Sequence, residues 1–160
     1  MTSPALDRTL EAMELMARAE SAVERLYEAC AGLWKEDVEF WHGLAAEEKH
    51  HSEHIRSMIS ILTGNPGNFQ SGRPFSSVAL QTFISGVERD IESVKQFTVP
   101  EMKALHIARD IEQALIECRF TEVVQTDDKH FRALADEVTR DTAIHRRLVE
   151  KKIIQLQAKG

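Results

Sequence analysis

The chain has 160 residues, of which 42% are hydrophobic and 29% are charged, as in one globular domain rather than a disordered or fibrous chain. Its formal net charge of −6 argues against nucleic acids and anionic membranes as partners, because both bind basic surfaces. Two isolated cysteines without a Cys-x-x-Cys pair exclude a cysteine-ligated metal centre and, with no secretory or membrane-spanning pattern, predict a cytoplasmic protein.

Apolar residues recur at helical spacing over most of the chain. Ser3 followed by Pro4 is typical of a helix start, and the apolar stripe that follows continues as far as Trp34. A second helix is predicted from about Asp37 to Leu62, because a Thr-Gly-Asn-Pro segment follows and ends it. We therefore expect two long helices in the first 62 residues.

After a predicted loop at residues 64–75, the pattern indicates three more helices. A shorter helix is expected over about 77–97. Thr98-Val99-Pro100-Glu101 matches a capping box, so the next helix is expected to start there and to include residues as far as Val123. The last helix is expected from 126–128 to about Gln157. The sequence thus predicts a single all-α domain over residues 1–160, a four-helix bundle with an extra helix in the connection between helices 2 and 3.

Charged residues lie in the apolar stripes of these helices. Glu48 and His51 are three residues apart on the apolar face of the second helix. Glu20, Glu112 and His145 lie in the stripes of the first, third and last long helices. Charged groups in an apolar core are costly unless they are paired or bind a metal. A Glu from each of two helices, with Glu-x-x-His from the others, is the ligand pattern of di-iron and di-manganese bundles.

Three segments resemble, in helix order, the rubrerythrin branch of the ferritin-like superfamily: ESAVERLY at 20–27, LAAEEKHH at 44–51 and ARDIE at 108–112. The resemblance covers nearly the whole chain and implies a ferritin-like four-helix bundle. It implies redox chemistry on hydrogen peroxide or dioxygen at two iron ions, or manganese, in a protein that we expect to be a homodimer. The implied metal ligands are Glu20, Glu48, His51, Glu112 and His145.

The chain departs from the rubrerythrin pattern in two places. Thr142 stands three residues before His145, where the family has Glu, and Asp141 or Glu137 would have to substitute for it. Asp141 is one residue out of register, about 100° around the helix. No cysteine pair is present to hold the iron of a rubredoxin-like domain, so we expect an external electron donor or slow oxidase-like turnover.

Two other residues leave alternatives open. Arg119 lies seven residues after Glu112, and its guanidinium would either neutralise Glu112 or Asp141 in place of one metal ion or face water. Together with Thr142, Arg119 allows a degenerate or single-metal site in a non-catalytic binding or structural module. Iron sequestration in a large assembly is a further alternative. Tyr27 is expected in the core with its hydroxyl on a carboxylate, and a catalytic redox role is the alternative for it.

Overall fold

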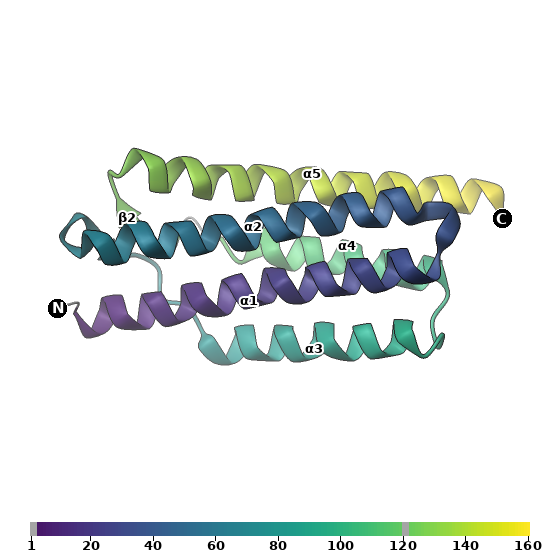
Figure 1. Ribbon diagram of the computed structural model, residues 1–160, viewed down its shortest axis with the longest axis horizontal. Helices are drawn as coiled ribbons and strands as arrows, with labels where there is room; N and C mark the ends of the chain where they lie inside the picture. The colour runs from purple at the N-terminus through teal and green to yellow at the C-terminus, as the bar shows by residue number, and fades with distance from the viewer. Residues whose placement is uncertain (1–2, 120–121) are drawn as a thin grey trace.

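The computed structural model describes residues 3–119 and 122–160, and over these ranges the protein is built from five α-helices and two short strands (Figure 1). The helices run over these ranges: α1 Pro4–Leu33, α2 Val38–Gly64, α3 Ser77–Lys95, α4 Glu101–Glu117 and α5 Lys129–Lys159. The predicted all-α class is confirmed, as is a helix in the connection between the second and third long helices.

The helices lie side by side along the long axis of the molecule (Figure 1). α1 packs against α2, α4 packs against α5, and α2 also contacts α5. The connecting helix α3 lies on the outside of α1 and runs in the same direction, which carries the chain back so that α4 runs opposite to α1. The four helices α1, α2, α4 and α5 therefore enclose a common interior.

Side-chain caps begin two of these long helices where the sequence predicts them. The Ser3 hydroxyl accepts a hydrogen bond from the backbone N–H of Leu6 at 3.2 Å. The Asp128 carboxylate accepts one from the N–H of Phe131 at 2.8 Å. Each cap satisfies a backbone donor that has no partner within its helix.

The capping box predicted at the start of α4 is wrong. The Thr98 hydroxyl donates to the backbone carbonyl of Ser93 at 2.9 Å, at the end of the preceding helix. Pro100 takes the N-cap position of α4 and provides no side-chain hydrogen bond. The Thr98 hydroxyl therefore helps to close α3 instead of opening α4.

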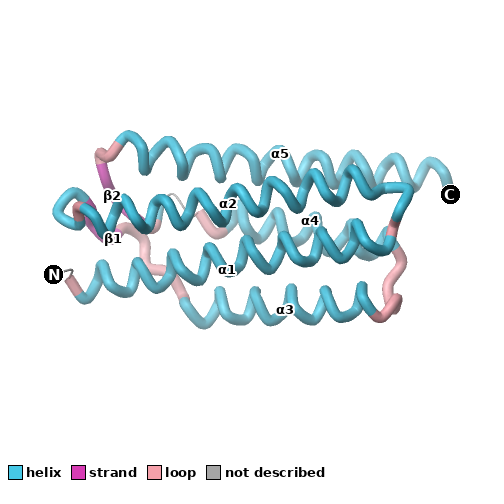
Figure 2. The backbone as a smooth tube through the Cα atoms, in the orientation of Figure 1, coloured by secondary structure: helices cyan, strands magenta, loops and turns pink. Residues whose placement is uncertain are grey.

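The predicted loop at 64–75 contains a strand, β1 (Phe69–Ser71), which pairs antiparallel with β2 (Val124–Thr126) (Figure 2). The pairing continues at Gly72, whose N–H donates to the Val123 carbonyl at 2.8 Å. A Cβ at Gly72 would lie 2.1 Å from the carbonyl oxygen of Glu122, so only glycine permits this approach. The chain leaves α4 at Glu117, earlier than predicted, to make this pairing.

The interior is filled by large apolar side chains from all the long helices, among them Met13, Leu26, Trp41, Leu62 and Leu105. Within the described residues, no helix combines the length and the apolar character needed to cross a membrane.

Candidate metal centre

Charged and polar side chains occupy the middle of the apolar interior. Glu48, His51 and Glu112 are 0% exposed, His145 is 3% exposed and Glu20 is 5% exposed. These five residues come from α1, α2, α4 and α5. The prediction that they point into the core is therefore confirmed. Burial on this scale requires partners that neutralise or bind the charged groups.

A first group of potential ligands joins α1 to α2. Glu20, Glu48 and His51 each offer an atom within 4.8 Å of the others. His51 Nδ1 lies 3.8 Å from Glu20 Oε2 and 3.5 Å from Glu48 Oε2. Because Glu48 and His51 are one turn apart on α2, both face Glu20 across the interface between the helices.

A second group joins α2 to α4 and α5. Glu48, Glu112 and His145 also offer atoms within 4.8 Å of one another. His145 Nδ1 lies 2.9 Å from Glu48 Oε1 and 3.9 Å from Glu112 Oε1. Glu48 is thus common to both groups, with one oxygen on the His51 side and the other on the His145 side. This placement suits a carboxylate that bridges two cations.

Several of the buried ligand atoms lack hydrogen bonds. Within residues 3–119 and 122–160, no hydrogen-bond partner is present for Oε2 of Glu20, Glu48 and Glu112 or for either ring nitrogen of His51. A buried polar atom without a partner costs about 1–3 kcal/mol. Bound cations would satisfy these atoms, and carboxylate and imidazole donors suit iron and manganese. The residues present therefore fit a pair of such ions.

The carboxyl groups are held at different pKa values. Burial and the charge of Glu48 raise the pKa of Glu20 and Glu112 well above 4.5. Burial also disfavours the charged form of Glu48, but contacts from Glu20 and the histidines hold its pKa below the ordinary value. Burial opposes protonation of His51, yet the Glu20 and Glu48 carboxylates raise its pKa to about 11. The raised pKa values of Glu20, Glu112 and His51 favour their protonated forms when no metal is bound, and cations would compete with these protons.

Tyr27 lies beside the second group. It is fully buried, and its hydroxyl donates to Glu112 Oε1 at 2.7 Å, so the predicted contact with a carboxylate is confirmed. Burial and the nearby Glu112 raise the pKa of Tyr27 well above 10. The phenol therefore stays protonated and holds one oxygen of Glu112 in place.

The α5 side of the site lacks a carboxylate in the core. Thr142 is buried, but its hydroxyl donates to the Val138 carbonyl at 2.7 Å. Asp141 is 24% exposed, and its Oδ2 lies 3.5 Å from His51 Nε2. The Glu137 side chain is 45% exposed and pairs with His54 at 3.0 Å. Of the two substitutes considered for Thr142, only Asp141 contacts one of the buried histidines.

The inward orientation considered for Arg119 is wrong. The side chain of Arg119 is 67% exposed, and its Nη1 lies 3.8 Å from Glu122 Oε1. α4 ends at Glu117, and Arg119 has a positive φ of 49°, which turns the chain away from the helix axis. A spacing of seven residues from Glu112 therefore no longer places Arg119 on the same helical face.

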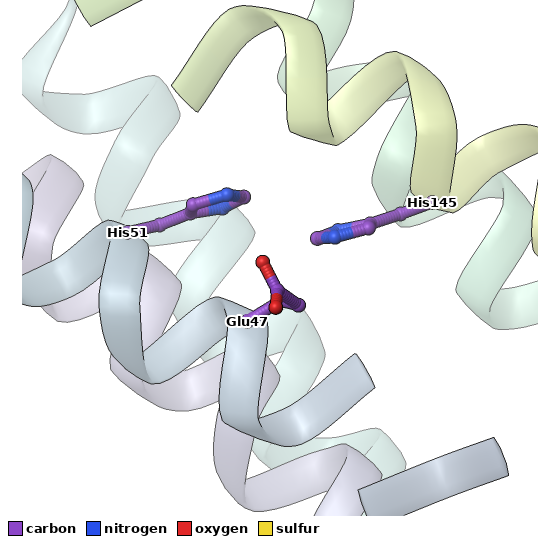
Figure 3. A group of neighbouring side chains, drawn as sticks. All are labelled: Glu47, His51 and His145. Atoms are coloured by element: carbon purple, nitrogen blue, oxygen red, sulfur yellow. The ribbon is translucent and has the colours of Figure 1, made fainter. Parts of the chain in front are cut away.

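Glu47 is a potential ligand that the sequence analysis missed. It forms a third group with His51 and His145, and its carboxylate lies beside the gap between the two imidazole rings (Figure 3). The rings are stacked with their centroids 5.2 Å apart. Glu47 precedes His51 by four residues, a spacing that also shares a helical face and that would have indicated this contact.

The remaining histidines of α2 lie on its flank. His42 pairs with Glu28 at 3.1 Å, and His50 lies 3.7 Å from Glu53. His54 is only three residues from His51 in sequence. It pairs with Glu137 and belongs to none of the buried groups.

Two hollows adjoin the site from different sides. A largely apolar cavity of about 200 Å³ is lined by Glu20 and Thr142, by apolar residues of all five α-helices, and by Arg119 and Glu122. A surface pocket of about 490 Å³ is lined by Glu47, Asp141 and His145. Small molecules therefore have two separate approaches to the buried carboxylates and histidines.

Comparisons of the chain with protein-family models, curated proteins and solved structures gave no match. The resemblance to rubrerythrins therefore stays a prediction. The function is therefore inferred from the geometry of the two groups that share Glu48.

Proposed function

We propose that the protein is a ferritin-like, di-iron or di-manganese carboxylate protein of rubrerythrin type that performs redox chemistry on hydrogen peroxide or dioxygen. The observation that carries the proposal is the pair of buried Glu/His groups joined by Glu48. Three carboxylates and two histidines converge from four helices, as in bundle sites for two metal ions. Unpaired atoms on Glu20, Glu48, Glu112 and His51 support the same proposal.

Each residue of the site has a distinct role in this proposal. Glu48 would contribute one oxygen to each ion, because its oxygens face different histidines. Glu20 and His51 would hold one ion, and Glu112 and His145 would hold the other. Bound iron or manganese would supply the electrons and the Lewis acidity for reaction with peroxide or dioxygen.

The protein around the ligands orients them and excludes water. Tyr27 fixes Glu112 through its 2.7 Å hydrogen bond, which orients the carboxylate. The apolar side chains packed around the ligands limit the access of water to reactive oxygen species, although the surface pocket reaches His145. In this proposal a homodimer receives electrons from an external donor, and Tyr27 is the candidate for a redox-active side chain.

A single-metal or degenerate site in a non-catalytic module is the second candidate. Thr142 favours it, since the hydroxyl is committed to Val138 and the α5 half-site has no buried carboxylate of its own. The exposed position of Arg119 counts against the version in which a guanidinium fills the site.

Substitutions in α2 test the proposed ligands. We expect Glu48→Gln and His51→Ala to lose most of the bound metal, because Glu48 belongs to both groups and no described residue forms a hydrogen bond with the His51 ring. His54→Ala is the matched control on the same helix, since His54 pairs with Glu137 outside the site. Metal content is measured by elemental analysis after anaerobic loading with ferrous ion. Equal losses in all three variants would contradict the proposed ligand set.

A further inference from the structure

The apolar cavity beside Glu20 is built from side chains of all five helices. It has a volume of about 200 Å³. Its apolar lining includes Met16, Ile55, Leu80, Leu115, Ile116 and Val138. Glu20 and Thr142 of the site also line the cavity, as do Thr139 and the exposed ion pair of Arg119 and Glu122. One oxygen of the buried Glu20 has no hydrogen-bond partner in the described part of the chain.

The cavity lies where the site lacks a carboxylate. Bundle sites for two metal ions draw one carboxylate from each of the four helices, and in this chain α5 has Thr142 one turn before His145. The Thr142 hydroxyl is committed to the Val138 carbonyl. Glu20, Glu48 and Glu112 alone would leave one positive charge of two divalent ions uncompensated, and the further nearby carboxylate, Glu47, lines the surface pocket and not this cavity. Asp141 lines the surface pocket, not this cavity.

We propose that the cavity binds a small organic monocarboxylate, whose carboxylate group takes the place of the missing α5 carboxylate at the metal centre. This inference rests on the proposed function, because the carboxylate needs the bound cations to offset the charge of Glu20. The apolar body of the molecule lies between Leu80, Ile116 and Val138.

The volume of the cavity sets the size of the ligand. An apolar cavity of about 150 Å³ is large enough for benzene. A cavity of about 200 Å³ accordingly takes one aromatic ring or a short alkyl chain that carries a carboxylate. Without metal, no bound cation attracts the carboxylate, and the Arg119 guanidinium that also lines the cavity is exposed and pairs with Glu122, so we expect binding to depend on metal.

Isothermal titration with benzoate tests the proposal on protein loaded anaerobically with Mn²⁺, after elemental analysis has established the metal content. We expect one benzoate per chain, at least tenfold weaker binding to metal-free protein, and at least tenfold weaker binding of the uncharged benzyl alcohol. Benzoate that binds equally well with and without metal would overturn the proposal.

Two variants locate the ligand in the cavity. Thr142→Glu supplies the missing carboxylate from the chain itself, so we expect the metal to be retained and benzoate affinity to fall at least tenfold. Ile116→Phe fills the cavity without changing a proposed ligand and should have the same effect. Ile107→Phe is the matched control, because Ile107 is on the same helix but lines a different surface pocket, against α3.

The outcomes distinguish a failure of the proposed function from a failure of this inference. A chain that takes up no metal overturns the proposed function and this inference with it. A chain that holds two ions per molecule but does not bind benzoate overturns the inference alone. Benzoate affinity that is unchanged in both Thr142→Glu and Ile116→Phe also overturns it.

Discussion

Glu48 is the residue that contacts both halves of the site. Its Oε1 lies 2.9 Å from His145 on α5, and its Oε2 lies 3.5 Å from His51 on its own helix. Glu20 and Glu112 each contribute to one half only. Loss of Glu48 should therefore affect both metal positions, whereas loss of Glu20 or Glu112 should affect one.

The hydrogen bond from Tyr27 to Glu112 is expected to stabilise the folded protein. Tyr27→Phe removes the donor to Glu112 and leaves that buried carboxyl group without its hydrogen bond, at a cost of about 1–3 kcal/mol. We predict a fall of this size in the free energy of unfolding of metal-free protein, measured by urea denaturation. Thr63→Val removes an exposed hydroxyl and should change the free energy by less than about 0.5 kcal/mol. Equal effects would contradict the role given to Tyr27.

The buried ligands were predictable from sequence, and the residues around them only in part. Glu48 and His51 were recognised because helical spacing placed both on an apolar face. Glu47 was missed because only the residues in the apolar stripe of the helix, such as Glu48, were considered as partners of His51. Its contact with His145 also depends on how closely α5 approaches α2, which the pattern of one helix does not contain.

At the scale of whole helices, starts were easier to predict than ends. Caps at Ser3 and Asp128 are local, so the sequence contains what is needed to place them. The end of α4 at Glu117 depends on pairing between β1 and β2, which brings together segments more than 50 residues apart. Because no local signal marks this pairing, Arg119 was expected on a helical face that the chain does not form.

The first turn of α4 carries a pH-dependent contact. Glu101 accepts a hydrogen bond from the Trp41 indole at 3.1 Å and lies near Asp37, which pairs with Lys152 of α5. Burial, together with the neighbouring Asp37, raises the pKa of Glu101 from 4.5 to about 7. The folded state therefore holds this proton more tightly than the unfolded state, and its contribution to stability is lost as pH rises from 4.5 to 7.

We predict that Glu101→Gln removes this penalty. The variant should gain in melting temperature over the unsubstituted protein at pH 8 and gain less, or nothing, at pH 4.5, because Glu101 is protonated at the lower pH. Thermal unfolding of metal-free protein at several pH values measures the difference. Glu117→Gln, an exposed substitution at the other end of α4, is the control. A gain that is largest at acidic pH would contradict this assignment.

For the whole molecule, the proposed ions would fasten four helices together at their centre. A ligand that binds only the folded state stabilises it by about 2.7 kcal/mol at a hundredfold excess over its dissociation constant. For a chain of 160 residues this corresponds to a rise of about 5–10 °C in melting temperature.

We predict such a rise when Mn²⁺ or, without oxygen, Fe²⁺ is added to the unsubstituted protein and to His54→Ala. Glu48→Gln should show little or none, because both groups lose a ligand. Differential scanning fluorimetry measures the shift. An equal rise in Glu48→Gln would show that the ions act elsewhere on the protein.

Assembly distinguishes the proposed enzyme from an iron store. The homodimer that we expect has twice the 18.2 kDa mass of the chain, whereas iron sequestration needs a large closed shell. Sedimentation velocity separates these assemblies directly. A shell would favour the sequestration alternative over redox turnover.

The count of bound metal ions tests the central claim most directly. The protein is purified without a tag from medium supplemented with iron and manganese, loaded anaerobically with ferrous ion, desalted and subjected to elemental analysis. The two groups that share Glu48 predict about two ions per chain. About one ion would indicate that the half-site beside Thr142 has been lost. No bound metal after loading would contradict the proposed centre.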